Sequence, residues 1–261
     1  MRLFRRATFA ERRAPAAAPL PRRLAIVPAL NERDSIGGVI DEIRGFDPGI
    51  EIVVVSDGSE DGTGEIARAR GVHVIDLPFN LGIGAAVQTG FRYAQANDFD
   101  LAVQIDADGQ HDPSELPKLF ALLESGEADL AIGSRFAGEH TYRSSFMRRF
   151  GIRLFALTVS AIARRRLTDT TSGFRAVNRR GIALFAADYP HDYPEVEATV
   201  MVIRHRLRVR EVPVRMRERT AGHSSITPLR SVYYIFKVLL ALFVDLFRPR
   251  ERSRELPLED R

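Results

Sequence analysis

From residue 24 onwards, short apolar runs alternate with longer stretches whose apolar positions recur every three or four residues. The runs over 24–30 and 51–56 are rich in Val, Ile and Leu and have the length of buried strands. The stretches over 33–46 and 82–97 have the period of amphipathic helices. Strands that alternate with helices of this length predict βαβ units, and therefore a mostly parallel sheet covered by helices on both faces.

The same alternation continues to residue 135, and it becomes less regular beyond that point. Further strands are predicted at 72–77, 100–106, 128–136, 170–179 and 208–219, and further helices at 62–71, 112–126, 145–163 and 194–207. The helix at 112–126 has Asp112 at its cap position and Pro113 at its first position. No linker-like composition interrupts residues 22–228, so we predict one α/β domain over this range.

The two ends of the chain differ from this domain. Residues 1–21 are rich in Arg, Ala and Pro and lack the apolar run of a secretory signal, so we expect a disordered basic tail there and a second disordered tail at 249–261. The segment 229–248 is mainly apolar but contains Lys237 and Asp245. A membrane span needs about 20 apolar residues. The pattern therefore favours an amphipathic apolar helix in the membrane interface, with a packed core helix as the alternative.

Composition narrows the possible functions only slightly. The chain has no cysteine, which excludes disulfides and thiolate metal sites. Its net charge is +4, and nearly all of its positively charged side chains are arginines. Such a surface suits anionic lipids or phosphorylated substrates, although a general preference for arginine gives the same composition. No nucleic-acid-binding signature accompanies the charge, so we do not expect nucleic acid as a partner.

Polar segments stand at the ends of four predicted strands: 28–32 (PALNE), 56–59 (SDGS), 80–84 (NLGIG) and 106–108 (DAD). In an open α/β sheet, ligands bind beyond the carboxyl ends of the strands, so we expect these segments on one rim. The glycine run at 82–86 lacks the spacing of a dinucleotide fingerprint, and close helix–sheet packing is the expected role of Gly84.

Asp106 and Asp108 are the strongest candidates for a metal site. Residues two apart in extended backbone point the same way, so both carboxylates can face one ligand. Two hard carboxylates suit Mg²⁺ or Mn²⁺, which keep coordination positions for phosphate oxygens, and Gln110 offers a third oxygen. A solvent-exposed Asp-Gly turn without a metal is equally compatible with these residues, and the local pattern leaves that alternative open. His111 adjoins this turn and is the one histidine with an expected link to the site.

The segments PALNE, VSDGSEDGT, NLGIGAAVQTG, DADGQHDP, GSRF and TTSGFRAVNR occur together in a familiar order and spacing. Over roughly 22–248 the chain resembles the family 2 glycosyltransferases, and among them the dolichyl- and polyprenyl-phosphate sugar synthases. The resemblance implies a GT-A fold, which is Rossmann-like, and a metal-dependent, inverting transfer of a hexose from GDP- or UDP-hexose to a polyprenyl phosphate. It also implies peripheral attachment to the cytoplasmic face of a membrane, where a small integral membrane protein is a further candidate partner.

The resemblance assigns the donor-binding residues first. Pro28, Asn31 and Glu32 match a segment that holds the nucleotide. Asp57 matches the second acidic position of a V-D-D-G-S pattern, whereas Ser56 replaces the first, which leaves recognition of the base open. Two further donor-binding residues, Arg219 and Ser224, fit a loop that closes over the donor, and three residues, Asp106, Asp108 and Gln110, match the metal- and diphosphate-binding motif.

The resemblance also names catalytic candidates. Arg135 and Arg175 match arginines near the donor diphosphate and the acceptor phosphate. Asp169 and Glu195 match acidic residues close to the transferred sugar. Each has a simpler alternative: the arginines as surface charges, Asp169 as a turn cap, and Glu195 as a favourable charge at a helix N-terminus.

Two other functions stay open at this point. One is a family 2 transferase whose acceptor is a hydroxyl of a glycan, protein or small molecule, which needs Asp169 or Glu195 as a base. The other is a non-catalytic nucleotide-sugar-binding scaffold subunit.

Overall fold

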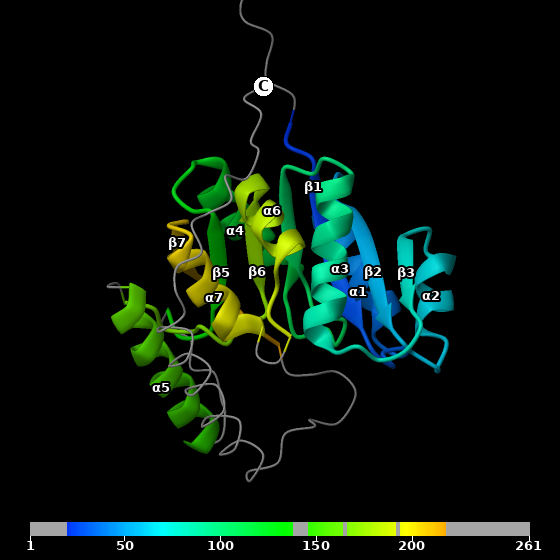
Figure 1. Cartoon of the computed structure of the whole chain (residues 1–261). Coiled ribbons are helices and arrows are strands. Elements are labelled where there is room, and N and C mark those ends of the chain that lie inside the picture. The colour runs from blue at the N-terminus through cyan, green and yellow to red at the C-terminus, as the bar shows by residue number, and fades with distance from the viewer. Residues whose placement is uncertain (1–19, 138–145, 164–165, 192–193, 218–261) are drawn as a thin grey trace, which may run out of the picture.

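The computed structural model describes residues 20–137, 146–163, 166–191 and 194–217. The strands are β1 (Arg23–Ala29), β2 (Glu51–Asp57), β3 (His73–Leu77), β4 (Leu101–Gln104), β5 (Leu130–Ser134), β6 (Arg175–Asn178) and β7 (Val209–Pro213). The helices are α1 (Ile36–Phe46), α2 (Thr63–Ala69), α3 (Ile83–Ala96), α4 (Leu116–Glu124), α5 (Phe146–Ala163), α6 (Arg179–Ala187) and α7 (Pro194–Arg204), with a 3₁₀ turn η1 (Pro113–Glu115) before α4. Figure 1 shows their arrangement around one central sheet.

The described strands form a seven-stranded sheet in the order β3-β2-β1-β4-β6-β5-β7. All neighbouring pairs are parallel except those of β6, which runs antiparallel between β4 and β5. The strand order reverses direction between β1 and β4, and such a switch point leaves a crevice beyond the carboxyl ends of the strands. The predicted mostly parallel sheet is confirmed, and its switch point locates the crevice.

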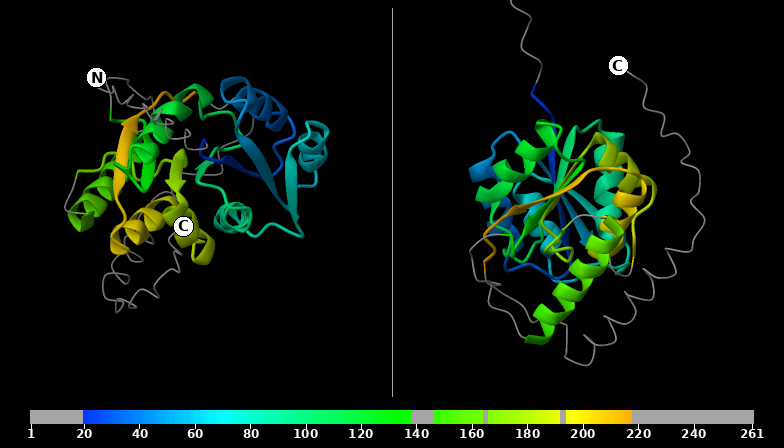
Figure 2. Two further views of the ribbon diagram at one scale, coloured as in Figure 1. Left: turned by 90° about the horizontal axis from the view of Figure 1, so that it is seen from above. Right: turned by 90° about the vertical axis from the view of Figure 1, so that its left-hand side faces the viewer.

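Helices cover both faces of the sheet (Figure 2). On one face, Phe91 of α3 and Phe185 of α6 pack with Ile26 and Val53 of the central strands, all without solvent exposure. On the other face, Ile40 of α1 packs into a core that also holds apolar residues of α4. Because both faces are buried, the central strands are apolar along their whole length rather than alternating.

Two glycines of α3 allow close approach to other elements. A Cβ at Gly90 would overlap Ile26 of β1, so the contact between helix and sheet depends on this position. A Cβ at Gly84 would instead overlap the main chain of Pro190 and His191. The expected helix–sheet role of Gly84 is therefore wrong: the first turn of α3 lies against a loop, and Gly90 makes the sheet contact.

Most predicted elements are present within a few residues of their expected bounds. Asp112 caps η1 by accepting a hydrogen bond from the Ser114 N–H at 3.0 Å. Helix α6 was not predicted, because its first turn, Arg-Arg-Gly, carries no helix signal. Its cap is clear in the structure: Asn178 Oδ1 accepts from the N–H groups of Arg180 and Gly181.

The terminal segments predicted as tails and as an interfacial helix lie outside the described residues, so those predictions stay predictions. Among the helices that the structure describes, none is both long enough and apolar enough to cross a bilayer.

Candidate active site

A cavity of about 590 Å³ opens at the carboxyl ends of β1, β2 and β4. The residues that line it come from all four polar segments, from the first turns of α3 and from the start of α7: Pro28, Ala29, Leu30, Asn31, Glu32, Asp57, Asn80, Gly82, Ile83, Ala86, Asp106, Ala107, Asp108 and Glu195. The structure therefore brings together segments that are up to 167 residues apart, as Pro28 and Glu195 are.

One wall of the cavity is the loop after β1. Asn31 lies in the left-handed region with φ of 53°, a conformation that Asn tolerates better than most residues. Its side-chain oxygen accepts from the Glu60 N–H at 3.0 Å, and its own N–H donates to Ser59 Oγ at 3.1 Å. The next residue, Glu32, donates its N–H to Thr63 Oγ1 at 2.9 Å. The two loops after β1 and β2 are thus held together as one surface.

Asp57, at the end of β2, is 3% exposed and holds a second wall. Its two carboxylate oxygens accept from the N–H groups of Leu81 and Gly82 at 2.8 and 2.9 Å. These bonds fix the loop that leads into α3. The structure thus shows Asp57 supporting the loop as well as lining the cavity, and its predicted contact with the donor stays a prediction.

The Asp-x-Asp segment forms the floor after β4. Gln110 donates twice to Asp108, from its N–H to Oδ1 at 3.0 Å and from Nε2 to Oδ2 at 2.8 Å. The side chain of Asp106 is 37% exposed, and its Oδ1 accepts a hydrogen bond from Gln104 Nε2 at 3.2 Å. In this arrangement the Gln110 amide nitrogen orients Asp108, so Gln110 supports the predicted metal site through Asp108.

The donor set fits a hard divalent cation. Asp106 and Asp108 both line the cavity, and carboxylate oxygens are the ligands that Mg²⁺ and Mn²⁺ prefer. Below them, Gln104 Oε1 is buried without a hydrogen-bond partner. Within the described ranges no group of three or more His, Asp or Glu side chains encloses a metal position. Two carboxylates on an open cavity match the way Mg²⁺ is held in phosphate-binding sites, where substrate oxygens and water complete the coordination.

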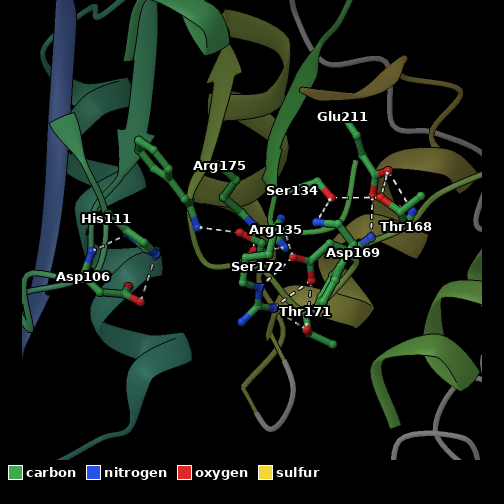
Figure 3. Close-up of polar contacts among 12 residues, drawn as sticks. Asp106, His111, Ser134, Arg135, Thr168, Asp169, Thr171, Ser172, Arg175 and Glu211 are labelled. Atoms are coloured by element: carbon green, nitrogen blue, oxygen red, sulfur yellow. Dashed lines mark hydrogen bonds and ion pairs between the residues drawn. The ribbon is translucent and has the colours of Figure 1, made fainter. Parts of the chain in front are cut away.

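Beside the cavity, Arg135 and Asp169 form a buried ion pair (Figure 3). The guanidinium Nε and Nη2 donate to the two carboxylate oxygens at 2.7 and 2.8 Å, and the Arg135 N–H adds a third bond to Asp169 at 3.0 Å. Arg135 Nη2 also donates to Thr171 Oγ1 at 2.8 Å. Two predicted catalytic residues therefore contact each other directly.

Glu211 of β7 supports this pair from the far side, and sequence reasoning missed it. Its carboxylate accepts from the N–H groups of Thr168 and Asp169 at 2.7 and 2.8 Å and from Thr168 Oγ1 at 2.8 Å. Burial raises the pKa of Glu211, although these hydrogen bonds oppose the shift. A glutamate in an alternating strand gives no sequence signal for such a role.

Arg175 is fully buried and bonds to main-chain carbonyls. Its Nε and Nη2 donate to Ser172 O at 3.1 and 2.7 Å, and its Nη1 donates to Glu195 O at 3.0 Å. Arg175 thereby ties the turn before β6 to the first turn of α7. A Cβ at Gly173 of that turn would lie 3.1 Å from Asp106 Oδ2, so the turn also lies against the acidic floor.

Glu195, in the first turn of α7, also lines the cavity. Burial raises the pKa of its carboxyl, the Arg175 charge opposes this shift, and the Asp106 charge adds to it. A carboxyl whose pKa is raised toward neutrality, in a cavity beside other charged groups, is a candidate acid or base.

Apart from Gln110, which donates to Asp108, the predicted site residues fall into three groups. Seven line the cavity: Pro28, Asn31, Glu32, Asp57, Asp106, Asp108 and Glu195. Three are buried, as an ion pair and as a clamp on main-chain carbonyls: Arg135, Asp169 and Arg175. Two, Arg219 and Ser224, lie outside the described residues.

A seven-stranded, mostly parallel sheet with an Asp-x-Asp turn at its switch point is the architecture of a GT-A glycosyltransferase. Solved structures of glucosyl-3-phosphoglycerate synthase from Mycobacterium tuberculosis share this fold. The UDP complex has a TM-score of 0.66 at 23% identity, covering 88% of this chain and 82% of that one. The complex with Mn²⁺, UDP-glucose and phosphoglyceric acid has a TM-score of 0.61 at 25% identity, covering 86% and 79%.

Residues 24–185 match the model of glycosyl transferase family 2, and the chain belongs to that family. It is 34% identical over 230 residues to the polyprenol monophosphomannose synthase of Mycolicibacterium smegmatis, covering 84% of this chain and 86% of the relative. It is 33% identical over 215 residues to the undecaprenyl-phosphate mannosyltransferase of Micrococcus luteus, covering 79% and 88%.

Proposed function

We propose that this protein transfers a hexose from a nucleotide diphosphate sugar to a polyprenyl phosphate. The observation that carries the proposal is the cavity in which Asn31, Glu32, Asp57, Asp106 and Asp108 converge at the switch point of the sheet. This chain matches more than four fifths of the length of two relatives whose names specify polyprenol or undecaprenyl-phosphate mannosyl transfer. That similarity supports a lipid-phosphate acceptor.

We further propose that Asp106 and Asp108, the latter oriented by Gln110, hold Mg²⁺ or Mn²⁺ together with the donor. When bound, such a cation neutralises charge on the diphosphate of the departing nucleotide. The Mn²⁺ complex of a solved relative supports this assignment. The donor is GDP- or UDP-hexose, and Asp57 and the 28–32 loop provide the surface on which the nucleotide lies.

The chemistry of the acceptor agrees with the side chains in the cavity. An oxygen of the acceptor phosphate attacks the anomeric carbon, the bond from that carbon to the donor diphosphate breaks, and the configuration inverts. A phosphate monoester is already largely ionised at neutral pH, so no residue has to remove a proton from it. In this scheme the Arg135–Asp169 pair and Arg175 act by positioning the walls of the site, and the positive charge of Arg175 favours the negative charge that develops on the leaving diphosphate.

Glu195 favours one alternative function, a family 2 transferase whose acceptor is a hydroxyl group. A hydroxyl acceptor requires a base, and the raised pKa of Glu195 in the cavity meets that requirement. With a lipid-phosphate acceptor, Glu195→Gln retains substantial turnover because no base is needed. With a hydroxyl acceptor, the same substitution lowers kcat by a factor of about 100 or more.

The decisive experiment is a donor screen with the full chain, MgCl₂ or MnCl₂, and polyprenyl phosphate, followed by mass spectrometry of the lipid. We expect one of the donors to give a hexosyl-polyprenyl phosphate, and the Asp108→Ala variant should not form this product. A product formed only on glycans, proteins or small-molecule hydroxyls would assign the alternative acceptor. Absence of turnover with every donor, despite nucleotide binding, would favour a scaffold subunit.

We also propose that the protein acts peripherally at the cytoplasmic face of a membrane, where its lipid acceptor resides, with or without a small integral membrane partner. Deletion of residues 229–248 should reduce sedimentation with liposomes and leave nucleotide binding intact. Unchanged sedimentation of the deletion variant would show that this segment does not attach the protein to lipid.

A further inference from the structure

His111 follows the Asp-x-Asp turn and is held rigidly by its surroundings. The residue is 5% exposed, and its ring is stacked on Phe174 with centroids 4.8 Å apart and planes 14° apart. Its main chain forms an antiparallel bridge with Met216, beyond β7. Contacts from the lead into β6 and from the segment after β7 therefore determine where the imidazole nitrogens lie.

Both nitrogens face Asp106 (Figure 3). The Asp106 N–H donates to His111 Nδ1 at 3.0 Å, and His111 Nε2 lies 3.5 Å from Asp106 Oδ2. Because Nδ1 accepts a hydrogen bond, the neutral ring carries its hydrogen on Nε2, on the side of the carboxylate. The separation of 3.5 Å is longer than a strong hydrogen bond, but an N–H dipole at this distance still attracts a carboxylate.

The side-chain contact of His111 is with one of the two carboxylate oxygens of Asp106, Oδ2. Gln104 Nε2 donates to the other carboxylate oxygen at 3.2 Å, and a Cβ at Gly173 would lie 3.1 Å from Oδ2. The remaining 37% of the Asp106 side-chain surface is open. The protein therefore supplies donors behind the carboxylate and leaves its free lone pairs toward the cavity.

We propose that His111 is a positioning residue that holds the Asp106 carboxylate toward the cavity before a cation or donor arrives. The inference rests on the proposed function, since it gives the oriented carboxylate a ligand to bind. Partners that orient metal ligands typically change metal affinity by about 10- to 100-fold when they are removed. Orientation in advance avoids an ordering cost at the moment of binding.

Three variants separate this role from a purely structural one. His111→Phe keeps a ring against Phe174 and removes both nitrogens. His111→Asn offers an oxygen to the Asp106 N–H in place of Nδ1 but leaves nothing in place of Nε2. His73→Phe is the control for loss of a stacked histidine, because His73 is stacked on Tyr93 at 4.7 Å but is exposed at the start of the edge strand β3.

Mn²⁺ binding to the full chain is measured by the electron paramagnetic resonance signal of free Mn²⁺, with MnCl₂ alone and with UDP or GDP added. We expect about tenfold weaker Mn²⁺ binding in both His111 variants, with His111→Asn folded at the assay temperature although it loses the ring stacked on Phe174. His73→Phe should bind Mn²⁺ like the wild type. Mn²⁺ affinity of His111→Asn within twofold of wild type would overturn the inference, and this variant carries the test if His111→Phe fails to fold.

Metal-free crystal structures of the wild type and His111→Asn separate failure of this inference from failure of the proposed function. We expect one Asp106 conformer, facing the cavity, in the wild type and several in the variant. A single cavity-facing conformer in the variant contradicts the positioning role whether or not Mn²⁺ binds. Several conformers, with no Mn²⁺ binding by the wild type, would support the positioning role and count against the proposed metal site.

Discussion

Arg135 and Asp169, 34 residues apart in the chain, meet as a two-pronged ion pair. Nε donates to Oδ2 at 2.7 Å and Nη2 to Oδ1 at 2.8 Å, with Arg135 8% exposed and Asp169 fully buried. This planar fork is the geometry in which arginine holds a carboxylate most strongly. Neither charge is stable here alone, because each is removed from water and compensated by the other.

The first prediction concerns this pair. Asp169→Asn should lower the free energy of unfolding by roughly 3 kcal/mol, since it removes the carboxylate that compensates the buried Arg135 charge. Urea unfolding at neutral pH measures the loss. The double variant Arg135→Met with Asp169→Asn should cost less than the sum of the single variants. Asp34→Asn, whose side chain is 80% exposed, is the control and should change little. Additive losses in the double variant would contradict a coupled pair.

The second prediction concerns Glu195, whose pKa burial raises above the ordinary 4.5. As pH rises above 4.5, the unfolded chain releases this proton before the folded one does, so stability falls through that window. Glu195→Gln lacks this dependence. Its melting temperature relative to wild type should therefore increase from pH 4.5 to pH 8. Glu124→Gln, at an exposed position on α4, serves as the control. A constant difference between Glu195→Gln and wild type over this range would argue against the raised pKa.

The third prediction concerns Asp129, a fully buried carboxylate away from the cavity. Burial opposes its ionisation, but hydrogen bonds from Arg208 and Asn178 outweigh this and lower the pKa from 3.8 to about 2. Its contribution is complete well above pH 3.8 and is lost as pH falls toward 2. Asp129→Asn should thus cost about 2 kcal/mol at pH 6. In chemical unfolding, the difference in free energy of unfolding between wild type and Asp129→Asn should be smaller at pH 3 than at pH 6. A difference that increases on acidification would contradict the lowered pKa of Asp129.

The fourth prediction compares three glycines. Gly90→Ala should destabilise the protein by about 1–3 kcal/mol, because the new methyl overlaps Ile26 in a filled core. Gly84→Ala should cost at least as much, since the obstacle is the main chain of Pro190 rather than a side chain. Gly38→Ala, in α1 with nothing within 4 Å of the new methyl, should stabilise by about 0.5–1 kcal/mol. Thermal unfolding of the three variants tests the order, and a stabilised Gly90→Ala would show that Ile26 can move aside.

Local patterns were sufficient to predict most of the elements and the convergence of the rim segments. Runs such as that in β2 predict buried strands because parallel strands are covered on both faces. Parallel strands place their carboxyl ends on one edge, so Asn31, Asp57 and Asp106 were expected on that edge, and the adjacency of β2, β1 and β4 brings them into one cavity.

Other features depended on contacts that no local pattern specifies. The antiparallel insertion of β6 between β4 and β5 sets Arg175 beside Gln104, and it brings Gly173 against the Asp106 carboxylate. The resemblance to a known family indicated that Arg135, Asp169 and Arg175 matter, but it did not indicate that the first two pair with each other. Glu211 gave no signal at all, because its partners are main-chain N–H groups that any sequence supplies.

The sequence by itself determined the class of fold, the acidic turn at the end of the fourth strand and the family to which the chain belongs, because each is written in short-range spacing. Only the tertiary structure decided which charges are buried together, that His111 faces Asp106 with both nitrogens, and that Gly90 rather than Gly84 contacts the sheet. Those outcomes follow from the packing of distant segments, where a few tenths of an ångström and the exclusion of water determine which groups pair.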